Sequence, residues 1–335
     1  MTRLRLVQRG LSAAILAACV TMATTAGAQR QQLAQANQAL QAGEADKALS
    51  LLNSLPPTNE TQAEAKNLEC RVLFTVEQWD RSVDACQQAV NIERQNSDYH
   101  MWLGRALGRK ASQANFLSAF SLGKRVRVEF EEAVKLNPRN ADALADLGEF
   151  YRSAPGVVGG GLDKAEGVAV QLDSADPARA HELRGRIAEE RKDFGTAERE
   201  YKQAIAVSAH PAFRWTTLAD FYRRRQRWTE MDSAIQSCVN AAAHDKRAGV
   251  PLFDGALLLI DANRDLPRAA RMLEDYLAGQ AKTEEAPAFA AYTKLAGVKM
   301  GLGDLAGAQR DKATALALAR EYKPAQDLKI KETRQ

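Results

Sequence analysis

The sequence has little of the residue types on which catalysis and metal binding most often depend. It contains four histidines and four cysteines in 335 residues. No pair of them has the H-x₃-H, H-E-x-x-H or C-x-x-C spacing of a metal or redox site, and no G-x-S-x-G motif stands beside a strand. Many carboxylates lie on charged helix faces, as at Glu129, Glu131 and Glu132. We therefore expect no enzyme activity, no metal site and no cofactor.

An excess of charge of one sign is also lacking. The whole chain carries a formal charge of +4. Removing Arg3, Arg5 and Arg9, which precede the only long apolar stretch, leaves 43 basic against 42 acidic residues. Nucleic-acid binding needs a strong basic field, so we expect no nucleic-acid partner.

The only long apolar stretch lies within residues 1–28. Leu11–Ala23 follows the charged start, and Ala26–Ala28 forms an A-x-A cleavage site, which together are typical of a secretory signal peptide. The stretch is too short to span a membrane. Leu16–Cys19 resembles the bacterial lipoprotein box, in which Cys19 would be lipidated. We expect export to the periplasm or the cell exterior, with a mature chain that starts at Gln29 or, as the alternative, at an envelope-anchoring Cys19.

What the sequence does contain is a helical pattern that repeats. A small residue is expected on the first helix of each unit, and the steps between these positions are 34, 34, 44, 37, 34, 38 and 39 residues. The positions are Ala36, Cys70, Gly104, Gly148, Gly185, Ala219, Leu257 and Ala296. The clearest units read Leu103-Gly104…Phe130…Ala133…Pro138 and Gly185…Ala197…Tyr201…Ala204…Pro211. These units resemble the tetratricopeptide repeat (TPR) pattern, W-x₂-L-G-x₂-Y…A-x₃-F-x₂-A…P, whose period is about 34 residues.

The resemblance implies an all-α fold, a right-handed α-solenoid of about eight helical hairpins. One hairpin cannot bury its apolar face alone, so each is expected to stack on the next over residues 29–320, followed by a polar tail at 321–335. The other interpretation, an irregular helical bundle, does not explain a period kept through so many units. Proteins of the family bind a protein or peptide in a concave groove lined by their first helices.

Repeat positions nine and twelve of the first helices point into that groove. Arginines recur there, at Arg71, Arg105, Arg152, Arg186 and Arg223. Guanidinium groups suit carboxylates through bidentate contacts, so these residues are candidates for binding an acidic partner. The alternative is that they pair with acids of the groove itself. The sequence predicts a non-catalytic scaffold that binds a protein or peptide of unknown identity.

Two units carry insertions. In unit three the extra residues lie near 109–122, where Phe116, Leu117 and Phe120 recur at roughly helical spacing. They either dock on the solenoid or contact a partner, ligand or membrane. The second choice gives an alternative function: an envelope-associated adaptor or carrier that uses this apolar insert, and a membrane contact is expected only there or through Cys19. In unit four, residues 154–164 form a glycine-rich loop. It lacks the preceding strand and the Lys-Ser or Lys-Thr of a P-loop, so we expect a structural turn.

Cys70 and Cys86 occupy facing positions of the second unit. An oxidising compartment favours a disulfide between them, provided that their Cα atoms lie within about 7 Å. The alternative is two small buried side chains at small sites. Cys238 is expected to be buried and unpaired.

Overall fold

The computed structural model describes residues 27–56, 61–245 and 249–330, and within them every regular element is a helix. The predicted signal segment, including Cys19, lies outside the described residues except for its last two positions. The first helix covers residues 27–42 and pairs with α2 (Ala45–Asn53). The other pairs are α3 (Gln62–Thr75) with α4 (Trp79–Ile92), α5 (Ser97–Gln113) with α6 (Phe116–Leu136), α7 (Ala141–Ser153) with α8 (Leu162–Ala175), α9 (Pro177–Glu190) with α10 (Phe194–Val207), α11 (Pro211–Arg224) with α12 (Trp228–Ala242), α13 (Gly249–Asp261) with α14 (Leu266–Ala278), and α15 (Ala288–Gly301) with α16 (Leu305–Leu318).

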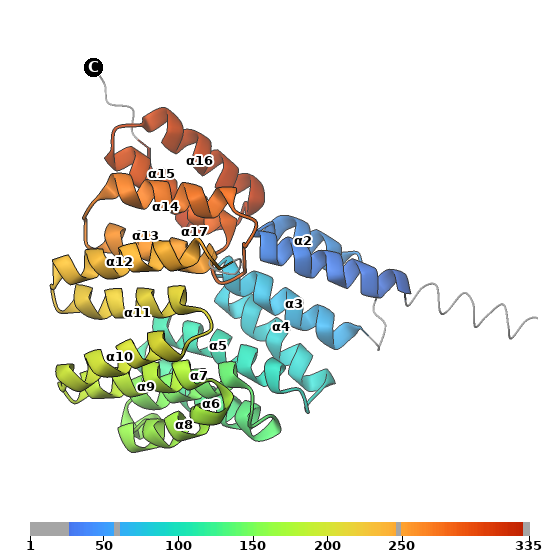
Figure 1. Cartoon of the computed structure of the whole chain (residues 1–335). Coiled ribbons are helices and arrows are strands. Elements are labelled where there is room, and N and C mark those ends of the chain that lie inside the picture. The colour runs from blue at the N-terminus through green and yellow to red at the C-terminus, as the bar shows by residue number, and fades with distance from the viewer. Residues whose placement is uncertain (1–26, 57–60, 246–248, 331–335) are drawn as a thin grey trace, which may run out of the picture.

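The helix pairs stack in chain order to form an α-solenoid (Figure 1). The predicted small residues allow the two helices of a pair to approach closely. A Cβ atom added to Gly104 would lie 2.5 Å from the ring of Phe130, and one added to Gly185 would lie 2.7 Å from Tyr201. Interhelical distance depends on the side chains at the contact. The predicted all-α solenoid of helical hairpins is therefore confirmed.

Unit seven departs from the expected register. The repeat pattern predicts Leu257 at the close-contact position, but its side chain is only half-buried. Gly255 takes that role instead, because a Cβ atom there would lie 2.6 Å from the terminal methyl group of Met272. The small residue of this unit is thus two positions earlier than the sequence pattern suggested.

Most hairpins turn through a residue with positive φ. This left-handed conformation occurs between the paired helices at Gly43, Glu77, Lys192, Gln226, Asn263 and Gly303. It is a common way to end a helix, because it lets the last carbonyls find hydrogen-bond donors. In units three and four the residue directly after the first helix, Ala114 or Ala154, is extended instead, and it is there that the two insertions enter. In unit four, Gly159 adopts a positive φ further along the connection.

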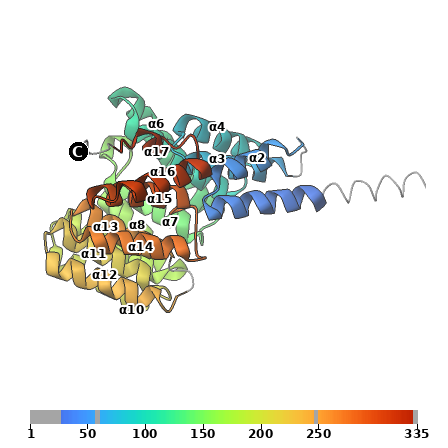
Figure 2. The same cartoon turned by 90° about the horizontal axis from the view of Figure 1, so that it is seen from above.

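The two ends of the solenoid meet. The first helix, α2 and α3 lie beside α15, α16 and the short helix α17 (Lys323–Asp327) (Figures 1 and 2). At the turn after the first helix, a Cβ atom on Gly43 would lie 2.3 Å from the backbone nitrogen of Ala288, so only glycine fits this close approach. The buried apolar residues of unit one therefore belong to the same core as those of units five to eight.

The fold also continues beyond the predicted boundary at residue 320. Tyr322 is 5% exposed and Ala325 is fully buried. Tyr322 packs edge-on against Phe289, with ring centroids 4.8 Å apart. Residues 321–327 therefore form part of the packed structure. The sequence suggested a polar tail because most residues of this segment are polar, and only Tyr322 and Ala325 are buried in the core.

The insertion in unit three lengthens both helices of its hairpin. Helix α5 has 17 residues and α6 has 21, whereas α3 and α4 have 14 each. At 1.5 Å per residue, α6 extends roughly 10 Å further than a helix of ordinary length here. Among the described residues, no helix is both long and apolar enough to cross a membrane.

Candidate binding surfaces

The five predicted groove arginines all contact acidic side chains of the same chain. Arg71 contacts Glu284, Arg105 contacts Asp146, Arg152 contacts both Glu149 and Glu190, Arg186 contacts Glu149, and Arg223 contacts Asp220. The row thus faces carboxylates, as a surface for acidic groups would, but these carboxylates belong to the protein itself. The sequence left two interpretations open: arginines that bind an acidic partner, and arginines that pair with acids of the groove itself. The second describes this geometry.

The Arg71 contact joins parts of the solenoid that are far apart in the sequence. Its Nε donates to Oε2 of Glu284 at 2.9 Å and its Nη2 donates to Oε1 at 2.5 Å. Glu284 belongs to the segment 279–287 between α14 and α15, and its backbone N–H donates to Oε1 of Gln41 at 3.3 Å. A loop of unit seven therefore crosses to the first two units and places a carboxylate on their inner face.

Arg105 lies between an aromatic ring and a buried acid. Its Nε donates to Oδ2 of Asp146 at 2.5 Å, and its guanidinium carbon lies 4.8 Å from the ring centroid of Trp102. Burial raises the pKa of Asp146 above its ordinary value, although the positive charge of Arg105 opposes this rise. Arg105 thus compensates a carboxylate that has lost most of its solvation, which is a structural role.

One turn further along α5, Arg109 is differently placed. Its guanidinium lies 6.0 Å from the ring of Phe74 and 6.0 Å from that of Trp79. The side chain is exposed, and within the described residues it has no carboxylate within ion-pair distance. It is therefore a cation available to a ligand, beside two aromatic rings.

These groups line a hollow at the centre of the solenoid. The cavity has a volume of about 790 Å³. First helices from both halves of the molecule contribute to it: Trp102 and Arg109 from α5, Phe253 from α13 and Ala290 from α15. It is large enough for several side chains of a peptide, and it combines aromatic surface with polar groups, as ligand sites do.

The opposite wall of the hollow is acidic. Glu285 follows Glu284 in the same loop, and burial raises its pKa. Asp254 on α13 follows the lining residue Phe253, and its pKa is raised to about 7, first by burial and then by the negative charges of Glu285 and Asp220. The hollow thus has aromatic and cationic side chains from α3, α4 and α5, and carboxylates from the segment 279–287 and from α7.

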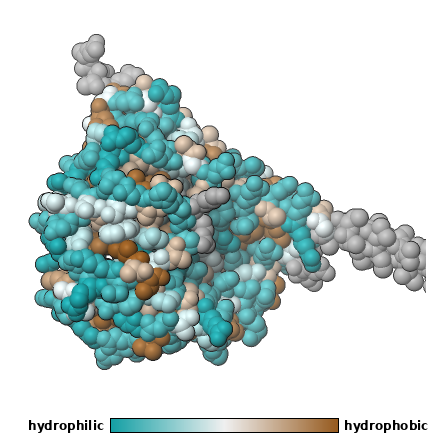
Figure 3. Space-filling model, viewed as in Figure 1, coloured by the Kyte–Doolittle hydropathy of each residue, from teal (hydrophilic) through white to brown (hydrophobic). Residues whose placement is uncertain are grey.

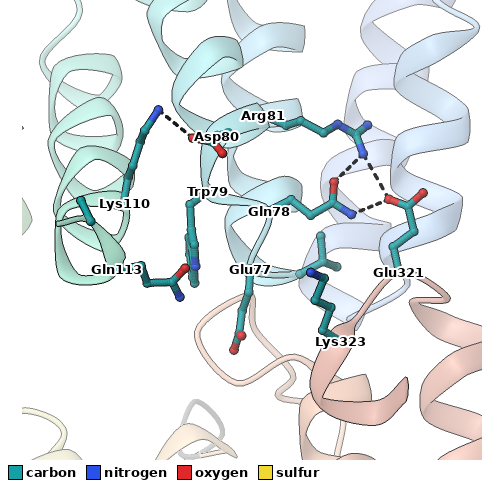
Figure 4. A pocket seen from close by; sticks show the side chains of 11 residues that line it. Glu77, Gln78, Trp79, Asp80, Arg81, Lys110, Gln113, Glu321 and Lys323 are labelled. Carbon is teal, nitrogen blue, oxygen red and sulfur yellow. Dashed lines mark hydrogen bonds and ion pairs between the residues drawn. The ribbon is translucent and has the colours of Figure 1, made fainter. Parts of the chain in front are cut away.

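A second cleft of about 640 Å³ lies where unit two meets the C-terminal end. Figure 4 shows Gln78 and Arg81 converging on Glu321, at 2.5 Å and 3.1 Å, while Lys110 pairs with Asp80 at 2.6 Å. Every one of these charged groups has a partner inside the cleft. The contacts hold unit two against the C-terminal segment, whereas Glu77 and Lys323 also line the cleft and take no part in these contacts.

The apolar residues of the insert are exposed. Phe116 is 84% exposed and Leu117 is 79% exposed, whereas Phe120 is 37% exposed. These residues form the first turns of α6, which Figure 2 shows at the edge of the molecule. They do not dock on the solenoid. Their environment is that of the second interpretation of the sequence, a surface that is free to contact a partner, ligand or membrane. By contrast, apolar side chains on the face in Figure 3 are scattered among hydrophilic ones.

The glycine-rich segment 154–164 packs against this extended helix. Val158 lies against Gly123 of α6, and Gly159, at φ +102°, lies against the side chain of Arg127. A side chain at residue 159 would collide with that arginine, since an added Cβ atom would lie 2.6 Å from its Cδ. The two insertions therefore support one another, and the glycines serve this packing.

Cys70 and Cys86 lie at disulfide distance, as predicted. Their Cα atoms are 5.1 Å apart and both side chains are fully buried. The third cysteine of the described residues, Cys238, is buried and free, and burial raises its pKa to about 12.

Sequence reasoning missed three contributors to the hollow: Glu284, Glu285 and Arg109. Arg109 falls at the edge of the insert and outside the repeat positions that were searched. The two glutamates lie in the segment 279–287, the longest connection between described helices. The length of this connection is the one feature of the sequence that could have drawn attention to them. Nothing local, however, indicates that Glu284 reaches Arg71, which is 213 residues away in the chain.

These observations define an α-solenoid of stacked helical hairpins with a lined central hollow and one protruding hairpin tip. No protein-family model and no curated protein matches the chain. Among solved structures, it is similar to the crystal structure of a thermophilic TPR protein of Thermus thermophilus, with 17% sequence identity and a TM-score of 0.49. That match covers 58% of this chain and 98% of the other.

Proposed function

We propose that the protein is an exported, non-catalytic scaffold of the TPR type, which binds a segment of a partner protein in its central hollow. The observation that carries the proposal is the juxtaposition of Arg109 with Phe74, Trp79 and Trp102 on one wall of an open cavity. A planar guanidinium binds a carboxylate with two hydrogen bonds, and flat rings accept apolar or aromatic side chains. An acidic segment with an apolar or aromatic residue fits both.

The contact between Arg71 and Glu284 supports an acidic partner. It is an example, within this chain, of a carboxylate held by an inner-face arginine through two hydrogen bonds. The partner's acid either binds Arg109 directly or competes with Glu284 for Arg71. Removing the loop carboxylate, as in Glu284→Gln, should therefore strengthen partner binding if competition occurs and leave it unchanged if Arg109 is the only anchor.

Export is the part of the proposal that rests on residues 1–28. The close pair of Cys70 and Cys86 is consistent with an oxidising compartment. Mass spectrometry of the protein from the producing cell should find a mature N-terminus at Gln29, or a lipid on Cys19. Recovery of the chain with Met1 from the cytoplasm alone would contradict export.

The binding proposal is tested by capture of partners from an envelope extract, followed by affinity measurement with the identified partner. Arg109→Gln should weaken binding about tenfold to a hundredfold, since a charge-assisted hydrogen bond contributes roughly 1.5–3 kcal/mol. Arg139→Gln is the matched control, because Arg139 is an exposed arginine in the connection after α6, at the other end of that helix. Equal affinities for the two variants would refute the hollow as the site.

A second function is favoured by a different observation, the exposure of Phe116 and Leu117. We propose, as the alternative, an envelope-associated adaptor or carrier that contacts a hydrophobic ligand or membrane component through this tip. Partner capture that survives Arg109→Gln but is abolished by Phe116→Ser would favour this function over the first.

A further inference from the structure

The tip of the α5–α6 hairpin combines exposed apolar residues with an unusual run of charge. Over residues 109–128 the chain has five basic residues and no acidic one. Elsewhere the two signs are nearly balanced, with 46 basic and 42 acidic residues in all. The tip is therefore the place where apolar exposure and local positive charge coincide.

The basic side chains nearest the tip remain available. Lys124 lies one turn after Phe120, with its Nζ 4.2 Å from the centre of that ring, and Arg125 donates to Oε1 of Gln87 at 2.9 Å. Both side chains are exposed, and neither has a carboxylate within ion-pair distance in the described part of the chain. Lys110, by contrast, pairs with Asp80. Two cations thus flank the apolar turns without neutralisation.

The tip is built to hold this arrangement. The side chain of Asn115 accepts a hydrogen bond from the backbone N–H of Ser118 at 3.0 Å, which caps α6 at its first turn. The glycine-rich segment supports the next turns through Val158 and Gly123. Phe116 and Leu117 are therefore fixed in an exposed position by a capped and supported helix, so little ordering is needed before they contact a partner.

We propose that this tip docks on an anionic membrane surface, with Phe116, Leu117 and Phe120 entering the interface and Lys124 and Arg125 contacting lipid headgroups. The proposal rests on the alternative function above and names its partner class. Apolar side chains inserted to about 5–10 Å, together with basic residues near anionic lipids, are the two contributions that surface attachment uses. The roughly 10 Å by which α6 is lengthened matches that depth.

Charge decides against the other obvious occupant, a second copy of the chain. A symmetric contact between two tips would place Lys124 and Arg125 of each copy near those of the other, because a two-fold contact pairs the same patch with itself. Juxtaposed like charges disfavour such a contact. An anionic lipid surface complements the same charges.

The test is sedimentation with vesicles of phosphatidylcholine, with and without about 30% phosphatidylglycerol, whose anionic surface attracts basic residues. The chain from Gln29 onward is used, because it omits the apolar leader and Cys19 while the described buried core starts at Leu33. We expect binding to the anionic vesicles only, weakened by salt. Phe116→Ser with Leu117→Ser should reduce partitioning by about tenfold or more, and Lys124→Gln with Arg125→Gln by about tenfold.

Matched controls keep the outcomes distinct. Val207→Ser removes an exposed valine on α10, and Arg139→Gln removes an exposed arginine at the far end of α6; both should bind vesicles as the unmodified chain does. Equal binding to neutral and anionic vesicles, or retention of binding by the Lys124 and Arg125 variant, would overturn the role of charge. Absence of vesicle binding, or an oligomer that only the Phe116 and Leu117 variant dissociates, would overturn the membrane proposal and leave partner binding in the hollow unaffected.

Discussion

The contact between Arg71 and Glu284 holds the two ends of the solenoid together, and removing it should destabilise the protein measurably. The side chains are 20% and 12% exposed, so the pair is largely removed from solvent. Hydrogen bonds to charged groups contribute about 1.5–3 kcal/mol each in net terms, whereas a charge left unpaired in a buried place costs about 3–5 kcal/mol. Arg71 also lies 5.5 Å from the ring of Trp102, which keeps part of its charge compensated. We therefore expect Glu284→Ala to lower the free energy of unfolding by roughly 2–3 kcal/mol.

The assay is a double-mutant cycle by urea unfolding. Glu284→Ala, Arg71→Met and the double variant are compared with the unmodified chain, and Met keeps much of the apolar volume of the Arg71 side chain. We expect a coupling energy of about 1.5–3 kcal/mol. The control is Glu132→Ala, whose partner Lys135 is 73% exposed, so its loss should change stability by less than about 0.5 kcal/mol.

A coupling energy below about 0.5 kcal/mol would refute this reasoning, because it would mean that the pair behaves like an exposed one. Small-angle scattering gives a second reading. If the contact helps to hold the two ends of the solenoid together, the Glu284 variant should have a larger radius of gyration. An unchanged radius together with lower stability would show that the remaining contacts between the two ends are sufficient to hold them.

Three further outcomes follow from the described contacts. Thiol counting on the unfolded, unreduced chain from Gln29 onward should find one reactive group, Cys238, because Cys70 and Cys86 lie at disulfide distance; three reactive thiols would disprove the bond. Burial raises the pKa of Asp254 to about 7 against an ordinary value of 3.8, so the unfolded chain loses this proton at lower pH than the folded one. The free energy of unfolding should therefore fall by roughly 3–4 kcal/mol as pH rises from about 4 to 7, and Asp254→Asn should remove that loss, as measured by urea unfolding at several pH values. Gly185→Val should lower the free energy of unfolding by about 1–3 kcal/mol, because the added side chain overpacks the contact with Tyr201. Gly297→Ala, in open space on α15, should raise it by roughly 0.5–1 kcal/mol. Thermal unfolding of the two variants measures both changes.

The parts of the fold that depend on neighbours in sequence were predictable. The contacts of Gly104 with Phe130 and of Gly185 with Tyr201 lie within one hairpin, where helix geometry converts residue spacing directly into facing positions. Unit seven shows the limit of this method. Its run Ala256 to Ile260 is apolar throughout, so the pattern does not distinguish which residue faces the partner helix, and the true close contact lies at Gly255.

The candidate surfaces were predictable only in part, because exposure and pairing depend on distant elements. The sequence identified the groove arginines, yet it did not decide between free cations and paired ones. That depends on whether residues such as Asp146 and Glu284 reach them, and Glu284 does so only because the solenoid curls until its ends meet. The apolar insert was likewise identified, but its exposure follows from helix lengths that carry Phe116 beyond any neighbouring unit.

The lengths of the two helices explain how this insertion leaves the repeat intact. Compared with α3 and α4, α5 gains three residues and α6 gains seven. Seven residues are close to two full turns at 3.6 residues per turn, so the added turns of α6 return the helix to nearly the same face. Phe130 therefore still meets Gly104, although ten extra residues separate them. Because the additions lie at the turn end of the hairpin, they create a new exposed surface away from the central hollow. The solenoid can in this way carry two binding surfaces, one on its inner face and one at a hairpin tip, whose residues are free to change independently.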